Sequence, residues 1–164
     1  MKKTPQDKEL EALLRASHIS GCGFLGTDTR ELWEIIQEDM NDVRAMGRTA
    51  KAIAARMKEL TAIGQRGLGD WVPAGEHLQV QCDDSRGVIP CPWPHHVRCL
   101  KRTTTVKSGS GETVRWSDLN THLIEAHGFF EGKGALFRLE PKKLIALIFG
   151  DEVIVEIQVS EGQA

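Results

Sequence analysis

Cysteine and histidine residues gather between Val80 and Phe130, and this gathering constrains the fold more than any other feature of the sequence. The candidate ligands are Cys82, Cys91, His95, His96, Cys99, His122 and His127. Zinc in proteins favours four tetrahedral ligands drawn from Cys and His, commonly supplied as two close pairs on separate elements. The sequence therefore predicts a metal site that ties two separate elements together.

The later pair is His122 and His127, whose spacing of four intervening residues is usual for zinc ligands. Residues 116–128 have the marks of a short helix, because Ser117 is a natural N-cap and Gly128 a natural stop. Residues five apart on a helix are turned by about 140° from each other. We therefore expect the last turn to adjust at Gly128 so that both imidazoles face one ion.

Several residues are candidates for the ligand that forms the earlier pair with Cys91. A turn at Asp83–Gly87 would form a hairpin that brings Cys82 and Cys91 together across neighbouring strands, and this is the preferred pairing. The next choice is His95, because Cys91-Pro-Trp-Pro-His95 would form a knuckle stiffened by its prolines. Cys99 and His96 are the remaining alternatives. The preferred set for Zn²⁺ is therefore Cys82, Cys91, His122 and His127.

The order of Cys82, Cys91, a hairpin and then Leu119, His122 and His127 resembles that of a ββα zinc finger. The helix of such a finger supplies two histidines. The resemblance covers residues 82–128 only, with a wider ligand spacing than in the family. It implies a zinc-binding ββα-like module.

The cysteine chemistry depends on the compartment. The sequence contains no apolar run of the roughly 20 residues needed to span a bilayer, and its charged N-terminus does not resemble a signal region. We expect a cytoplasmic protein, in which cysteines are metal ligands or core thiols rather than disulfides. Cys22, close to His18 in a glycine-rich loop, is expected to be a small buried thiol.

Apolar residues recur at helical spacing in the first part of the chain. The pattern predicts helices over 5–16, 28–47 and 49–64, the second opened by a capping box of Asp28 and Glu31 and the third capped by Thr49. Glycines and a proline between Gln65 and Gly75 leave no room for a regular element. We place a boundary there, between a helical region (1–69) and a mixed zinc-binding module (70–164).

The second region mixes strands with helices. Alternation predicts strands over His77–Cys82, Cys99–Val106 and Val153–Val159. A short helix over 142–149 is opened by Pro141. The fold class is therefore α+β.

Basic residues outnumber acidic ones between Val97 and Arg115, although the whole chain has a net charge of -2. The basic residues are Arg98, Lys101, Arg102, Lys107 and Arg115, against the single acid Glu112. Such a local excess is typical of a phosphate-binding face, so nucleic acid or another phosphate-bearing molecule is the expected partner. Phe129, Phe130 and Lys133 could add stacking and one more cation.

The metal could serve structure or catalysis. Four protein ligands close a zinc site, and closed sites are structural. If one position held water instead, Glu125 could act as general base of a zinc-dependent hydrolase. The order His122, Glu125, His127 does not match the motifs of zinc proteases. The structural role is therefore preferred.

Overall fold

The computed structural model describes residues 4–16 and 23–150. Its helices are α1 (Pro5–Arg15), α2 (Leu32–Ala45), α3 (Ala50–Gln65), α4 (Asp118–His127) and a last helix over residues 141–150. Together with a four-stranded sheet they form an α+β fold, as the sequence predicted. The expected helices near residues 5–16, 49–64 and 142–149 are confirmed with small shifts at their ends.

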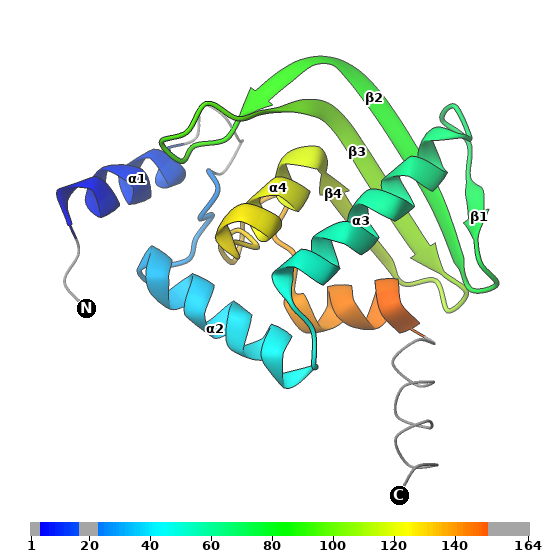
Figure 1. The fold of residues 1–164 in the computed structure, drawn as a ribbon, viewed down its shortest axis with the longest axis horizontal. Coiled ribbons are helices and arrows are strands. Elements are labelled where there is room, and N and C mark those ends of the chain that lie inside the picture. The colour runs from blue at the N-terminus through cyan, green and yellow to red at the C-terminus, as the bar shows by residue number, and fades with distance from the viewer. Residues whose placement is uncertain (1–3, 17–22, 151–164) are drawn as a thin grey trace, which may run out of the picture.

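The sheet consists of β1 (Val72–Ala74), β2 (Leu78–Pro90), β3 (Arg98–Ser108) and β4 (Thr113–Ser117). The strands pair in chain order, and every pair is antiparallel. The long strands β2 and β3 arch over α4 and α3 (Figure 1). The chain then passes from β4 directly into α4, which places that helix beneath the arch.

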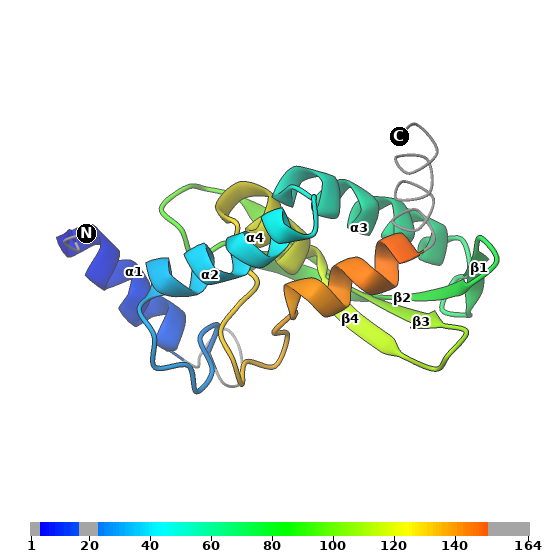
Figure 2. The ribbon, with the colours of Figure 1, turned by 90° about the horizontal axis from the view of Figure 1, so that it is seen from below.

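One face of the sheet carries the larger core. Side chains alternate along each strand, and Val80, Thr104, Val106 and Trp116 are all buried on the inner face. Packed against it are apolar residues of α3 and of the helix 141–150, such as Ile53 and Leu144. Figure 2 shows α3 lying along the sheet. The opposite face of the sheet keeps polar residues that are exposed or half-buried, such as Gln79 and Lys107.

A smaller core lies at the other end of the molecule. It is built from residues of α1, α2, α4 and the connecting segments: Leu14, Phe24, Leu25, Ile35, Cys91, Leu119, Leu123 and Phe129. Cys91 belongs to this core, and the two candidate ligands on α4 lie beside it, because His127 stacks on Trp93, which packs against the same core.

Two expectations about the chain are wrong. Helix α2 begins after Glu31 without a side-chain cap, because the Asp28 carboxylate instead accepts hydrogen bonds from Arg30 and from the backbone N–H of Lys133. The segment 65–75 also contains a regular element, since β1 pairs with β2 there. His18, Cys22 and the predicted strand Val153–Val159 lie outside the described residues.

Within the described ranges, none of the helices combines the length and the apolar character that crossing a bilayer requires.

Candidate metal centre

Four side chains converge between the β2–β3 loop and α4. Cys91, His95, His122 and His127 each offer one ligand atom, and these atoms all lie within 4.8 Å of one another. Cys91 Sγ is 3.6 Å from His127 Nε2, and His95 Nε2 is 3.0 Å from the same atom. Ordinary zinc bond lengths in a tetrahedron give ligand separations of about 3.6 Å for S to N and about 3.4 Å for N to N. The group is therefore the right size for one ion.

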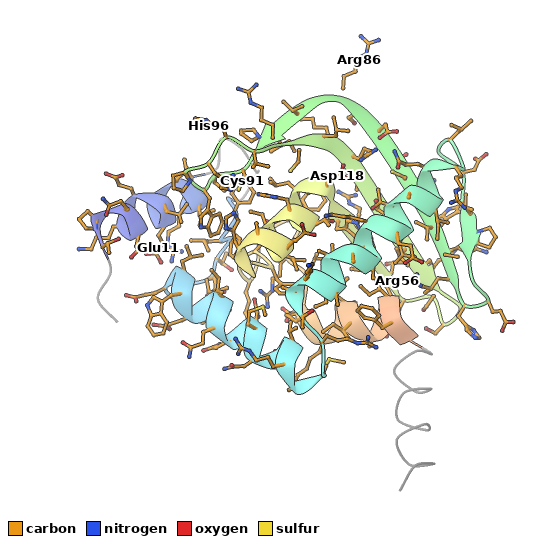
Figure 3. The ribbon with its side chains drawn as sticks, in the orientation of Figure 1. Glu11, Arg56, Arg86, Cys91, His96 and Asp118 are labelled. Carbon is orange, nitrogen blue, oxygen red and sulfur yellow. The ribbon has the colours of Figure 1, made fainter. Side chains whose placement is uncertain are left out.

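The loop between β2 and β3 positions the first two ligands. Its base is closed where Pro90 pairs with Arg98 and where Cys91 N donates to Val97 O at 2.9 Å. Inside the loop, His95 N donates to Trp93 O at 2.7 Å. Two prolines fix φ at alternating positions within this short loop. The result is a stiff knuckle that presents a thiol and an imidazole on the same side, toward α4; Figure 3 shows Cys91 between loop and helix.

The end of α4 supplies the other two ligands. Ser117 and Asn120 form a capping box at its start, and Gly128 ends it in the left-handed conformation at φ 62°, so both predicted ends of this helix are confirmed. Beyond the cap, Phe129 N donates to Leu123 O, six residues back. The imidazole centroids of His122 and His127 lie 5.5 Å apart. The two imidazoles therefore lie close together at the end of α4, although residues five apart on a regular helix are turned by about 140° from each other.

His122 carries an unmet bonding requirement. Its Nε2 is buried and has no hydrogen-bond partner among the described residues, and a buried polar atom without a partner is costly. Burial and the neighbouring His95 lower the pKa of His122, and burial together with His122 and His95 lowers the pKa of His127 to about 4. Both rings are neutral at pH 7, which is the form that binds metal.

Trp93 supports the site in a way that sequence reasoning missed. Its ring stacks on that of His127, with centroids 4.0 Å apart and planes 8° from parallel, and it also touches Phe129. Stacking on one face fixes the orientation of an imidazole, as partners outside the ligand set do in metal sites. In the sequence, this supporting role is indicated by a tryptophan placed between two prolines, Pro92-Trp93-Pro94.

Cys82 lies outside this group, although it was the preferred partner of Cys91. The predicted hairpin between them is absent: Asp83–Gly87 continues β2, with a register shift between Asp84 and Val88. Because a strand advances about 3.3 Å per residue, the two thiols are too far apart for one ion. Cys82 instead faces α3, hydrogen-bonded to Thr104. Cys91, His122 and His127 do come together, and His95 takes the position expected for Cys82.

The other candidates have different surroundings. His96 is exposed, and its side chain lies on the outer side of the loop (Figure 3). Cys99 pairs with Ile89 in the sheet and is half-buried near Cys91. Glu125, the proposed general base of the alternative hydrolase, accepts a hydrogen bond from Lys58 Nζ at 2.7 Å.

The predicted basic cluster is divided between two sides of the sheet. Lys107 and Arg115 share the outer face, because Thr105 lies opposite Arg115 and Lys107 alternates with Thr105. Lys101 continues the same row. Arg102 turns inward to Asp118, with Nη2 2.8 Å from its carboxylate, and Arg98 lies with His122 on the rim of a surface hollow of about 390 Å³.

Comparison with known proteins assigns no family, since no protein-family model, no curated protein and no solved structure matches this chain.

Proposed function

We propose that the protein is a zinc-binding protein whose ion is held by Cys91, His95, His122 and His127 and serves mainly to stabilise the fold. The observation that carries the proposal is the convergence of four ligand atoms from two separate elements. The unpartnered Nε2 of His122 supports it independently, because coordination to an ion would satisfy this buried atom.

The donor set favours zinc over other cations. Three imidazoles and one thiolate exclude the hard ions Mg²⁺ and Ca²⁺, which prefer oxygen ligands. Zinc accepts mixed nitrogen and sulfur ligands in a tetrahedron. Burial raises the pKa of the Cys91 thiol, and coordination would offset this effect because metal binding releases the thiol proton.

The four ligands support a structural role. They fill a tetrahedral shell, which leaves no position for a catalytic water. The Glu125 carboxylate is engaged by Lys58, so it is not held ready as a base. A bound zinc ion contributes roughly 10 kcal/mol or more of apparent folding free energy in small zinc domains. The hydrolase alternative requires one of the four groups, most simply Cys91, to leave the ion.

Elemental analysis of protein purified without added metal or chelator tests the proposal. We expect one zinc per chain in the wild type and in Cys82→Ser, and loss of zinc in Cys91→Ser. Absence of stoichiometric metal, or retention by Cys91→Ser with loss by Cys82→Ser, would overturn the ligand set. A cobalt-substituted sample whose visible spectrum changes when small anions are added would favour an open, catalytic site instead.

Nucleic acid is the proposed partner of the outer sheet face. Lys107 lies 5.0 Å from the centroid of the Trp71 ring, and Arg115 lies 5.0 Å from that of Phe137. Each of these two cations is thus paired with a ring on which a base could stack, the combination used by single-strand binders. Gln79, Gln81 and Thr105 on the same face add hydrogen-bonding groups, and the exposed Asp83 contributes one negative charge.

A charge-reversed double variant, Lys107→Glu with Arg115→Glu, should abolish binding to a short single strand that the wild type binds at low salt. Arg98→Glu is the matched control, since Arg98 is also exposed but lies off this face. If the control weakens binding as much as the double variant does, the outer face is not the binding surface.

A further inference from the structure

Glu131 combines three unusual properties in the loop after α4. Its side chain is buried, with 3% of the residue exposed. Its backbone adopts the left-handed conformation at φ 65°, which is unfavourable for a residue with a Cβ. Its carboxylate Oε2 accepts a hydrogen bond from Asn120 Nδ2 at 2.6 Å, whereas Oε1 is buried without a partner among the described residues. Strained backbone and unmet polar groups concentrate at functional sites.

Glu131 lines a cavity of about 260 Å³, here called the Glu131 crevice. Its apolar lining comes from Phe24, Ile89, Leu119, Leu136 and Phe137, and its polar lining includes Ser85, Lys101 and Ser117. An enclosed cavity of roughly 150 Å³ holds a benzene molecule. The Glu131 crevice is therefore large enough for a planar heterocycle.

The β2 bulge shapes one wall of the crevice. Asp84 pairs with Arg102 and Val88 with Leu100, so residues 85–87 of β2 lie opposite the single residue Lys101. Bulges of this kind redirect side chains and are frequent beside binding sites. Here the bulge places Ser85 and Lys101 at the same cavity.

The loop that carries Glu131 is anchored from several sides. Arg138 donates to the Glu131 carbonyl at 2.7 Å and pairs with Asp39 of α2. Gly132 N donates to Phe24 O at 2.8 Å. The position of the carboxyl group is thus set by the surrounding structure before any ligand arrives.

These features together specify a ligand. The free oxygen of Glu131 can accept a hydrogen bond from a donor on the ligand. The aromatic and aliphatic walls can pack against a flat apolar ring, and Lys101 can pair with an anionic group. Leu136, which is 65% exposed at the crevice, would gain burial when such a body binds. An amino-bearing purine or pyrimidine with an attached phosphate meets all of these requirements.

We propose that the Glu131 crevice binds the base of a nucleotide through an exocyclic amino group, which donates to Glu131 Oε1, while Lys101 faces the phosphate. The proposal rests on the phosphate-binding outer face, because Lys101 belongs to both. Burial raises the pKa of Glu131 to about 7, so a donor from the ligand would stabilise the ionised form that accepts its hydrogen bond.

Replacing Glu131 by Gln makes a specific prediction about base preference. The oxygen of the introduced amide must accept the hydrogen bond from Asn120, so the amide NH₂ group faces the free position. An amino group on the ligand then meets a donor, and a base carbonyl such as that of uracil meets a suitable partner. The variant should therefore reverse the preference, an effect that a general loss of folding cannot produce.

The experiment is calorimetric titration of the whole, zinc-loaded chain with AMP, CMP, UMP and adenosine. At pH 8, above the pKa of about 7 of Glu131, the wild type should bind AMP or CMP about tenfold more tightly than UMP, the effect of one hydrogen bond to a charged group. Glu131→Gln should bind UMP more tightly than AMP or CMP, and Glu9→Gln, an exposed site on α1, should behave like the wild type. Retained zinc and a cooperative thermal unfolding transition would show that each variant is folded.

Two further measurements test the phosphate contact and the source of the ligand separately from the base site. Lys101→Gln should reduce AMP binding to the level of adenosine; if it does not, the phosphate contact is wrong while the base site stands. Hexamers of A and of U distinguish a free nucleotide from a base within a strand as the source of the ligand. Equal binding of AMP, CMP and UMP by the wild type, an unchanged preference in Glu131→Gln, or no binding of any monomer or hexamer would overturn the proposal.

Discussion

His95 and His96 are neighbours in the sequence but lie in different environments, which offers a matched pair of variants. His95 belongs to the group of four ligands, whereas His96 is exposed. Loss of an outer partner of a metal ligand costs roughly 10- to 100-fold in affinity. We therefore expect His95→Ala to weaken zinc binding by more than about 100-fold and His96→Ala to leave it unchanged, as measured by competition with a chromophoric chelator.

Equal effects of the two substitutions would show that the knuckle is held by its prolines alone, without an ion bound through His95. Local spacing could not choose between these residues, because Cys91-x3-His95 and Cys91-x4-His96 are both acceptable spacings for zinc ligands. The choice is made by the backbone of the loop, in which His95 N bonds back to Trp93 O.

Glu131 should make the stability of the fold depend on pH. Burial raises the pKa of this carboxyl from 4.5 to about 7, although the hydrogen bond from Asn120 and the charge of Arg138 both act to lower it. The folded chain therefore holds the proton more tightly than the unfolded chain. The stability associated with this group is complete below pH 4.5 and is lost as the pH rises through about 7.

Urea unfolding at a series of pH values measures this effect as the difference between the wild type and Glu131→Gln, in which the titration is absent. We expect the wild type to lose about 3 kcal/mol relative to the variant between pH 4 and pH 8. Effects of pH on the histidines and on zinc cancel in the difference. A constant difference across this range would mean that Glu131 has an ordinary pKa.

At the scale of elements, β2 shows where sequence reasoning was limited. Asp83–Gly87 has the composition of a hairpin turn, and Gly87 does take a positive φ of 106°. A bulge within a continuous strand uses the same residues as a turn between two strands. The distinction is made by pairing with β3, which local composition does not contain. A turn at these residues would bring Cys82 beside Cys91, whereas the bulge keeps both residues on one continuous strand.

Helix α4 shows the opposite case, because its ends are specified locally. Ser117, Asn120 and Gly128 each act within one turn of their own position, so the sequence could predict the helix and its two histidines. The three-dimensional partners of those histidines came from elsewhere in the chain and were only partly predictable.

Gly128→Ala tests whether the end of α4 positions His127. The left-handed conformation costs a residue with a Cβ about 1–2 kcal/mol, and the new Cβ would lie 3.2 Å from Met40 Sδ. We expect thermal or urea unfolding to show a loss of this size, together with weaker zinc binding. Gly109→Ala is the control, since its Cβ meets nothing within 4 Å and its φ is not positive. If Gly128→Ala is less stable but binds zinc with unchanged affinity, the helix cap stabilises the fold without positioning His127.

At the scale of the whole molecule, the candidate metal centre lies beside only one of the two cores. The smaller core contains Cys91, Leu123 and Phe129, whereas the larger core joins the sheet to α3 and the helix 141–150. The alternation of apolar residues predicted the strands that contain Val80 and Val106, and both of these side chains are buried. It could not predict that burial is divided between two cores, because this depends on how distant elements pack.

This division predicts that removing the metal affects the two ends of the molecule unequally. Chelation deprives α4 and the knuckle of their common anchor, so the elements that meet at the smaller core should open first. Native-state hydrogen exchange reports such local opening. We expect the amides of α1 and of residues 89–99 to lose most of their protection after chelation, while the paired strands β2 and β3 near Val80 and Val106 keep theirs. The His96→Ala protein should show the same contrast. If protection falls uniformly instead, the ion stabilises the whole fold as one cooperative unit and the two cores do not open independently.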